Sequence, residues 1–349
     1  RACVAGEEAA PARRAGIVVD APRAARLARR CALRRFAGAI TRRVLHPRWR
    51  VGRLHTSPEA LLGGERPSIA WLDLPRGRFW ADPFPLVTGG RVEVLLEGYD
   101  YARDRGYLAR AALDGDRVAG PVLDLARPAW HRSYPFVVED GSKRYILPEE
   151  SQRRRVALYA VDGDGLREAR VLIENFAAVD PTLVRHAGRW WLFAGDAERD
   201  ENAAVMLFHA SSLDGPWEPH PLNPIVRDIR SARPAGTPFA VDGVLYRPAQ
   251  DCSSGYGARV ALARIDVLTT EAYRETVVAH VAPPAHGRGR HGLHTFALRD
   301  GVCLVDGKDL VVDPAATWAL LRLDLRRLLR EPSARARRIP SATEAPLRS

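Results

Sequence analysis

A repeat of about fifty residues constrains this chain more than any other feature. In each copy a strand-like run ends at a turn containing glycine, and a second strand-like run follows. The turn glycines stand at positions 90, 141, 188, 243 and 301, with spacings of 51, 47, 55 and 58 residues. Asp-Gly and Gly-Gly between alternating apolar runs indicate tight hairpins, because such turns need positive φ angles.

Further strand candidates follow the hairpins, among them 156–161, 169–173, 205–210, 259–265, 273–278 and 318–323. Four strands in each of five repeats predict an all-β fold, a five-bladed β-propeller. A two-sheet sandwich is the alternative, but it predicts turns about every 8–12 residues and no fifty-residue period. An N-terminal strand, 51–54 or 69–72, is expected to close the ring so that no sheet edge stays open.

The charge of the chain is concentrated at its ends. The 349 residues include 53 Lys+Arg and 42 Asp+Glu, a formal net charge of +11. Residues 13–53 carry +12 and residues 322–349 carry +5, whereas residues 54–321 sum to −5. A strongly basic chain suggests a nucleic-acid partner, but an acidic body argues against a nucleic-acid groove, so we expect no nucleic acid.

These patterns divide the chain into a basic N-terminal extension (1–48), the propeller (49–323) and a basic C-terminal tail (324–349). Residues 23–45 are predicted to form a helix, since Leu33, Phe36 and Ile40 share one face among arginines. One interpretation is a helix that lies on an anionic membrane surface or contacts an acidic partner domain. The other is a linker helix packed on a neighbouring domain, and both stay open here.

Several other classes of protein are disfavoured. No apolar run is long enough for a membrane-spanning helix, which needs about 18 residues. The four cysteines, Cys3, Cys31, Cys252 and Cys303, are too widely separated for a disulfide framework or a CxxC metal site. Neither a phosphate-binding glycine motif nor a nucleophile elbow is present. We expect no cofactor and a cytoplasmic protein, with peripheral membrane contact through residues 23–45 as an option.

Polar residues open or close the paired strands of every repeat. The pairs are Asp82 with Glu97, Tyr134 with Glu149, Asp180 with Asp196, Arg233 with Gln250, and His294 with Asp306. A hairpin returns the chain to the face that it left, so all five pairs are expected at one end of the central channel. Such convergence is typical of a ligand pocket.

The residue types at these positions suit a sugar. One carboxyl can protonate a leaving oxygen while another activates water or acts as a nucleophile. The candidate catalytic residues are Asp82, Asp180, Glu149 and Asp251. Aromatic faces, amides and arginines would bind hydroxyls and a phosphate or carboxylate group. The candidate substrate-binding residues are Trp80, Tyr134, Arg233, Arg247, Gln250, His294 and Asp306. The alternative for Asp82 is a purely structural turn, because Asp-Pro is common in turns.

The segment 286–294, His-Gly-Arg-Gly-Arg-His-Gly-Leu-His, contains three histidines. Its spacing matches no common zinc pattern. We therefore expect no metal and favour a flexible loop that contacts an anion or a sugar.

Ordered motifs over about residues 49–323 resemble a known family. They include Phe79-Trp80-Ala81-Asp82-Pro83-Phe84, Ser133-Tyr134-Pro135-Phe136, Tyr145-Ile146-Leu147-Pro148-Glu149, Val179-Asp180-Pro181-Thr182, Arg233-Pro234-Ala235-Gly236 and Tyr246-Arg247-Pro248-Ala249-Gln250-Asp251. The resemblance is to the N-terminal domain family of the glucosamine inositolphosphorylceramide transferases. That domain in turn is similar to the five-bladed propellers of arabinanase- and β-xylosidase-type glycosidases.

The resemblance implies a carbohydrate-active protein of glycoconjugate or surface-polysaccharide metabolism, with a glycan, sugar-phosphate or glycolipid ligand. The similar glycosidases place an Asp base on the first blade, an orienting Asp on the third and a Glu acid on the fourth. Asp82 and Asp180 match the first two. The fourth blade opens at Arg233 without a Glu, so the acid would be Glu149 or Asp251. This departure leaves glycosyl transfer, glycoside hydrolysis and a non-catalytic glycan-binding or scaffolding role open.

Overall fold

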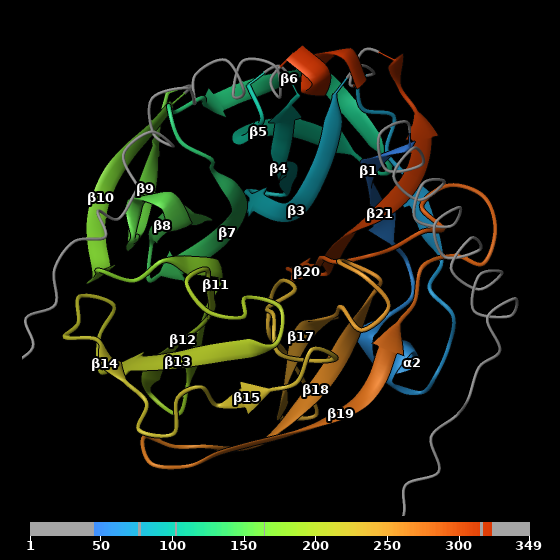
Figure 1. Ribbon diagram of the computed structural model, residues 1–349. Coiled ribbons are helices and arrows are strands. Elements are labelled where there is room, and N and C mark those ends of the chain that lie inside the picture. Colours follow the sequence, from blue (N-terminus) through green and yellow to red (C-terminus); the bar gives the residue numbers. More distant parts are fainter. Residues whose placement is uncertain (1–44, 76–77, 102, 164, 315–316, 323–349) are drawn as a thin grey trace, which may run out of the picture. The chain divides into compact units, whose positions relative to one another are not determined.

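Five antiparallel sheets are arranged around a central axis, which confirms the predicted five-bladed β-propeller (Figure 1). The computed structural model describes residues 45–75, 78–101, 103–163, 165–314 and 317–322. The predicted helix over 23–45 and the basic tail fall almost wholly outside these residues, and the boundaries at 48 and 323 stay predictions.

The first four blades follow one another along the chain. The first blade consists of β3 (Phe79–Thr88), β4 (Arg91–Asp100), β5 (Arg105–Asp114) and β6 (Arg117–Ala126), and the second of β7 (Ser133–Asp140), β8 (Lys143–Glu149), β9 (Arg155–Asp162) and β10 (Gly165–Glu174). The third consists of β11 (Ala178–His186), β12 (Arg189–Asp196), β13 (Ala204–Ala210), β14 (Glu218–Pro219) and β15 (Val226–Arg227). The fourth consists of β16 (Phe239–Val241), β17 (Val244–Asp251), β18 (Arg259–Leu268) and β19 (Tyr273–Val281). In each blade the first strand lies innermost, because each hairpin steps outward from the axis (Figure 1).

The fifth blade combines both ends of the propeller. Its strands are, from the axis outward, β20 (Phe296–Arg299), β21 (Val302–Val312), β1 (Leu45–Leu54) and β2 (Ile69–Trp71). Both expected closing segments are therefore used. The expectation of a strand over 318–323 was wrong, since residues 317–322 are helical. The reason is that β1 already occupies the position beside β21.

Helices are few in the described part of the chain. The helix α2 (Pro58–Leu62) begins at Ser57, whose hydroxyl accepts a hydrogen bond from the backbone N–H of Ala60 at 3.2 Å. A single 3₁₀ turn, η1 (Ser151–Arg153), follows β8. None of the helices in the described residues is long and apolar enough to cross a membrane.

The apolar core lies between the blades. Phe84 of the first blade belongs to the same buried cluster as Phe136 of the second and Leu183 of the third. A second cluster joins Val51 of the fifth blade to Leu96 of the first. Two further clusters fill the seams on either side of the fourth blade. The apolar side chains therefore lie in the seams between blades, and polar side chains lie at the end of the channel.

Candidate active site

Three blades share the same irregularity on the innermost strand. Asp82, Tyr134 and Asp180 each precede a proline and have φ angles of 46°, 49° and 48°. At each of them two residues oppose one on the partner strand, which is a β-bulge. Asp tolerates positive φ better than most residues, although such a conformation still costs about 1–3 kcal/mol. Three matching bulges re-aim three side chains at the same level of the propeller.

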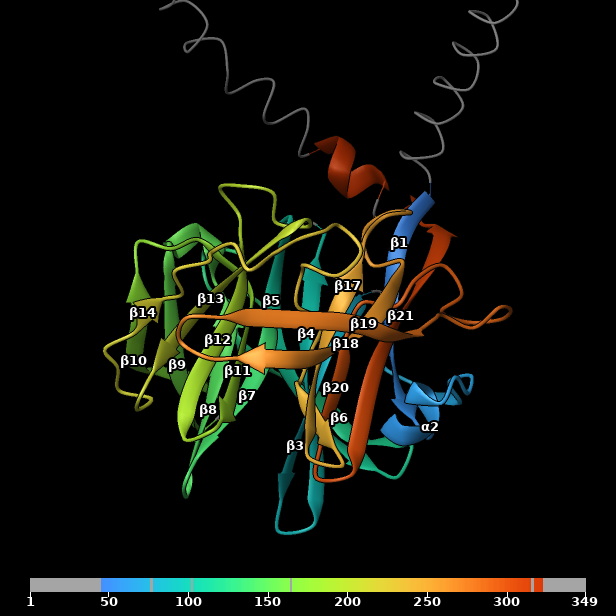
Figure 2. The same cartoon turned by 90° about the horizontal axis from the view of Figure 1, so that it is seen from below.

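This level lies at one end of the channel. The bulges stand near the start of their strands, so they are remote from the hairpin between β3 and β4. Figure 2 shows that hairpin at one end of the propeller, with the start of β1 and the helix 317–322 at the other. The predicted convergence of distant polar residues therefore takes place at the end that carries the start of β1.

The fourth blade opens differently. Gly236 has a φ angle of 120° and forms a bridge with Phe296 of the fifth blade. A Cβ at position 236 would lie 2.0 Å from the carbonyl oxygen of Phe296. The backbone at Gly236 lies directly against the backbone of Phe296, which leaves no room for a side chain at position 236. This segment therefore carries a glycine and no bulged carboxylate.

The second strands of two blades carry a carboxylate that binds the next blade. The Oε2 atom of Glu149 accepts the backbone N–H of Asp180 at 3.0 Å, and Oδ2 of Asp306 accepts the N–H of Asp82 at 3.3 Å. Each carboxylate thereby holds the bulge of the following blade in place. Charge-assisted bonds to a backbone N–H are among the stronger hydrogen bonds.

Glu97 occupies the same strand position as Glu149, but its side chain lies beside Asp82 of its own blade. Burial and the charge of the neighbouring Asp82 raise the pKa of the Glu97 carboxyl. Gly106 on β5 leaves the room for it, since a Cβ there would lie 2.4 Å from Oε1 of Glu97. The Nε2 atom of His131 lies 3.8 Å from the same oxygen. Glu97 is absent from the predicted site residues, although its register match with Glu149 is a signal that identifies it.

Asp180 is the carboxylate with a direct cationic partner. Its Oδ2 atom lies 2.7 Å from Nε of Arg233 and 3.0 Å from Nε2 of Gln250. Arg233 also donates to Asn202 at 3.1 Å and lies 5.0 Å from the centre of the Tyr256 ring. The predicted residues Arg233 and Gln250 are thus brought to the site, where they contact Asp180.

Asp82 lies at the centre of a second network. Thr295 donates its hydroxyl to Oδ1 of Asp82 at 2.8 Å, and Nδ1 of His294 lies 2.5 Å from Asp306 and 3.8 Å from Asp82. The His294 ring stacks on Trp49 of β1 with centroids 3.8 Å apart. These contacts fix the imidazole between the fifth and first blades.

Burial dominates the electrostatics of the cluster. Asp82, Glu97, Glu149 and Asp180 are between 3% and 8% exposed. Burial raises the pKa of Asp82 to about 6, although His294 opposes the shift. Burial raises the pKa of Asp180 to about 7 against the effect of Arg233, and it also raises the pKa of Glu149.

Glu97 is a further carboxyl whose pKa is raised. Burial raises this pKa well above the usual range, and the nearby charges of Asp82 and Glu149 raise it further. Burial lowers the pKa of His131, so this imidazole is neutral at pH 7. Two neighbouring carboxyls, Glu97 and Asp82, therefore both have raised pKa values.

The Tyr134 side chain lies at the centre of the propeller, and its hydroxyl forms hydrogen bonds that connect blades. Its hydroxyl exchanges a hydrogen bond with Thr182 at 2.8 Å and accepts the N–H of Gly236 at 2.6 Å. It thereby links the second, third and fourth blades. The substrate-binding role of Tyr134 stays a prediction beside this bridging role.

Three predicted site residues lie elsewhere. Asp251 accepts hydrogen bonds from Ser253 and Arg259. Burial raises the pKa of Asp251, but these bonds outweigh burial and the pKa is lowered. Asp251 is therefore not suited to be an acid. It follows Gln250 on β17, and successive side chains of a strand point to opposite faces. Arg247 instead binds Glu275 of β19 at 2.7 and 2.9 Å.

Trp80 is the third of these residues. It is buried in the seam between the first and fifth blades, and its indole N–H donates to the carbonyl of Pro75 at 3.0 Å. It therefore presents no open face to a ligand in the channel.

The described residues include one group with ligand atoms close enough for a cation. The ligand atoms of Asp82, His294 and Asp306 all lie within 4.8 Å of one another. In the structure Nδ1 of His294 is bonded to Asp306, and Asp306 also accepts the N–H groups of His294 and Thr295. These bonds account for the buried oxygen atoms without an ion.

Comparisons with known proteins identify a family for this chain. The family model described as "Glucosamine inositolphosphorylceramide transferase 1, N-terminal" matches residues 73–296. The glucosamine inositolphosphorylceramide transferase 1 of Oryza sativa subsp. japonica is 36% identical over 208 residues, which are 57% of this chain and 28% of that protein. That of Arabidopsis thaliana is 34% identical over 207 residues, 57% of this chain and 27% of that protein.

The chain thus spans less than a third of the length of these relatives. Among solved structures, a family 117 glycoside hydrolase of Zobellia galactanivorans has a TM-score of 0.48 and 16% identity, covering 78% of this chain and 92% of that one. An exo-1,5-alpha-L-arabinanase from a bovine ruminal metagenomic library has a TM-score of 0.43 and 10% identity, covering 59% and 80%. By the extent of the family match, this chain belongs to the glucosamine inositolphosphorylceramide transferase 1 N-terminal family.

Proposed function

We propose that this propeller acts on the glycosidic bond of a glycan or glycolipid precursor in glycoconjugate or surface-polysaccharide metabolism. The observation that carries the proposal is the group of four buried carboxyls, of which Asp180 pairs directly with Arg233 and Asp82 lies 3.8 Å from His294. Buried carboxyls without counterions reduce stability, and they are typical of acid–base sites. The names of the relatives support a sugar-bearing lipid as the ligand.

In the proposed reaction Glu97 is the acid and Asp82 is the base. The bond between the anomeric carbon and the leaving oxygen breaks, and that oxygen takes the proton of Glu97. The anomeric carbon forms a bond to the oxygen of water or of an acceptor hydroxyl, whose proton passes to Asp82. Asp82 then releases its proton to water and Glu97 takes a proton from water, which restores the starting state.

The other residues have positioning roles. Arg233 and Gln250 hold the carboxylate of Asp180, and Glu149 holds the Asp180 backbone. Asp180 in turn would orient the sugar. Glu97 replaces Glu149 and Asp251 as the acid in this proposal, because Glu149 accepts an N–H and the pKa of Asp251 is lowered.

Turnover by carboxyl variants tests the proposal. Suitable probes are nitrophenyl glycosides and a nucleotide-activated amino sugar with inositolphosphorylceramide as acceptor. Glu97→Gln is expected to reduce kcat by about 10²–10⁴-fold, since that is the usual contribution of general acid–base catalysis. Glu93→Gln, at the hairpin end of the same strand, is the matched control and should retain full activity.

A non-catalytic glycan-binding or scaffolding role is the second candidate. It is favoured by Arg233, which stands where the fourth blade would supply an acid and pairs with Asp180. In that case Glu97→Gln and the parent chain would show the same glycan affinity and neither would turn over any probe.

A peripheral location on the cytoplasmic face of a membrane is part of the proposal. It rests on the arginine-rich sequence 23–45, which lies outside the described residues except for Leu45. Deletion of residues 23–44 keeps β1 intact and should abolish co-sedimentation with phosphatidylserine vesicles at low salt. Unchanged co-sedimentation would identify the segment as a linker.

A further inference from the structure

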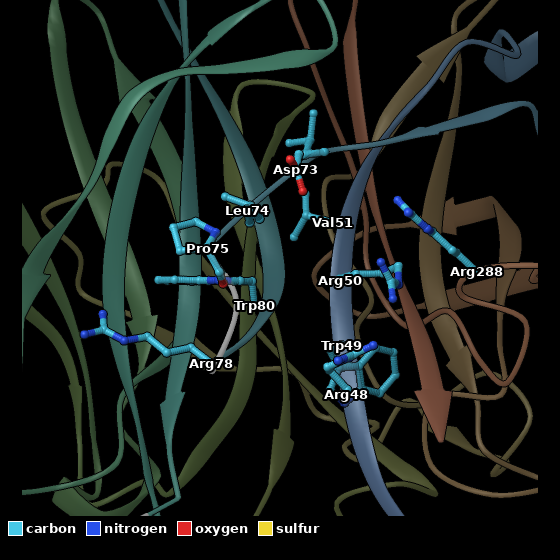
Figure 3. Close-up of a pocket in the computed structure, with 11 residues that line it drawn as sticks. Arg48, Trp49, Arg50, Val51, Asp73, Leu74, Pro75, Arg78, Trp80 and Arg288 are labelled. Carbon is cyan, nitrogen blue, oxygen red and sulfur yellow. The ribbon is translucent and has the colours of Figure 1, made fainter. Parts of the chain in front are cut away.

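A cavity of about 320 Å³ lies at the seam between the first and fifth blades, apart from the carboxyls of the channel. Three segments line it (Figure 3). They are Arg48, Trp49, Arg50 and Val51 of β1; Leu72, Asp73, Leu74, Pro75, Arg78 and Trp80 at the approach to β3; and Arg288 of the loop before β20. The walls are therefore built by parts of the chain that are distant in sequence.

The cavity is strongly basic. Four arginines line it against one carboxylate, Asp73. The Arg78 side chain extends away from β1 (Figure 3), where it donates to the Tyr107 hydroxyl at 3.0 Å and lies 3.6 Å from Asp124. The other three, Arg48, Arg50 and Arg288, lie at β1 and the loop.

One carboxylate holds two walls of the cavity together. Asp309 of β21 accepts hydrogen bonds from Nε and Nη2 of Arg50 at 2.7 and 2.6 Å through Oδ2. Its other oxygen accepts the N–H of Gly289 at 2.7 Å. Gly289 has a φ angle of 72°, and a Cβ there would lie 2.5 Å from the Trp71 ring. The adjacent Arg288 is thereby fixed beside Arg50, and its guanidinium points toward β1 (Figure 3).

The other two arginines are uncompensated. Within the described residues neither Arg48 nor Arg288 has a hydrogen bond or an ion pair, and both are exposed. Trp49, which also lines the cavity, stacks on His294 with centroids 3.8 Å apart. A ligand in the cavity would therefore be separated from the carboxyl cluster by one indole ring.

We propose that this cavity binds a phosphate group, carried either by a soluble sugar phosphate or by a lipid headgroup. Guanidinium groups match the oxygen atoms of phosphate with paired N–H donors and retain their charge at all relevant pH values. Arg50 is held by Asp309, and Arg48 and Arg288 supply the free donors. The site does not depend on the chemistry of the carboxyl cluster, so either can fail independently.

The test compares two double variants of the full chain. Arg48→Ala/Arg288→Ala removes the free donors, while Arg117→Ala/Arg185→Ala removes two exposed arginines outside the cavity. Glycerol 3-phosphate and inorganic phosphate serve as probes in isothermal titration calorimetry. The cavity variant is expected to bind at least about tenfold more weakly than the parent, since charge-assisted bonds to phosphate are lost. The control is expected to retain parental affinity, because both variants keep the basic ends.

Vesicles distinguish the two sources of phosphate. Co-sedimentation is compared between phosphatidic acid in phosphatidylcholine and phosphatidylcholine alone. If the cavity variant also loses vesicle binding relative to the control, the site takes a lipid headgroup; if only the soluble probes are affected, it takes a soluble phosphate. Equal phosphate affinity of the two double variants, or no phosphate binding by the parent chain, overturns the proposal. Unfolding midpoints within a degree of the parent verify that both variants fold.

Discussion

Two buried polar groups in this propeller differ in how well their charges are neutralised. In the fourth blade Arg247 is fully buried, and its donors reach Glu275 and the backbone carbonyls of Ser231 and Ala232. At the channel end the four carboxyls Asp82, Glu97, Glu149 and Asp180 face one arginine, Arg233, and the imidazole of His294, which lies 3.8 Å from Asp82. Both groups look alike in the sequence, where each is a charged residue next to a proline or at a strand end.

The difference shows what identifies a site in such a fold. Burial and charge are common to both groups, so neither property distinguishes them. The carboxyl cluster has an excess of like charge and strained backbone at two of its members, Asp82 and Asp180. The Arg247 pair has neither, because every donor has an acceptor. A deficit of counterions, rather than burial, is the feature that points to function.

The largest expected effect is on the paired group. Arg247→Ala leaves Glu275 as an uncompensated buried charge and should lower the free energy of unfolding by about 3–5 kcal/mol. Denaturant unfolding measures the change. Arg264→Ala, which breaks the exposed pair with Asp266 on β18, is the control and should leave the free energy of unfolding close to that of the parent. Equal losses for the two variants would show that the Arg247 pair is no more important than a surface pair.

The second effect has the opposite sign and depends on pH. Because the pKa of Asp82 is raised from 3.8 to about 6, the folded protein binds this proton more tightly than the unfolded chain. The associated stability is fully present below about pH 4 and is lost as the pH rises through about 6. Asp82→Asn remains uncharged, so it should be more stable than the parent at pH 8 by about 1–3 kcal/mol and equal to it near pH 4.

Asp228→Asn is the matched control for Asp82→Asn. Hydrogen bonds from Arg230 lower the pKa of Asp228, so its carboxylate adds stability above its unfolded pKa and loses it as the pH falls. The control variant should therefore be less stable than the parent at pH 8. If Asp82→Asn also destabilised the protein at pH 8, the carboxyl cluster would not be under-neutralised and the comparison above would fail.

The smallest effect concerns the hydroxyl that links three blades. Tyr134→Phe leaves the buried N–H of Gly236 without its acceptor and should reduce the free energy of unfolding by about 1–2 kcal/mol. Tyr145→Phe on the neighbouring strand should change it by less than about 0.5 kcal/mol. Glycan affinity should be the same for both variants. A selective loss of affinity in Tyr134→Phe would support Tyr134 as a substrate-binding residue.

Periodic features of the sequence predicted the fold well. The turn glycines and alternating strands are local signals, and each hairpin forms where its turn residues require it. The repeat of Asp82 and Asp180 before proline also predicted two members of the cluster. The strand predicted over 318–323 failed because apolar runs of that length suit either a helix or a strand. Only the pairing of β1 with β21 decides which segment completes the fifth blade.

The partners of each charged side chain were not predictable from the sequence. Arg233 and Arg247 stand fourteen residues apart in similar proline-containing segments, yet one reaches Asp180 and the other Glu275. Strand alternation and blade packing direct each guanidinium, and these depend on contacts between residues more than 25 positions apart. Glu97 was predicted at the channel end but not as a catalytic residue, because its burial and the charges of Asp82 and Glu149, which raise its pKa, arise only when the blades assemble. The sequence by itself therefore determined the number of blades and the level at which polar residues gather. The tertiary structure decided which of those residues are neutralised, because electrostatic energy depends on distance and burial and not on order along the chain.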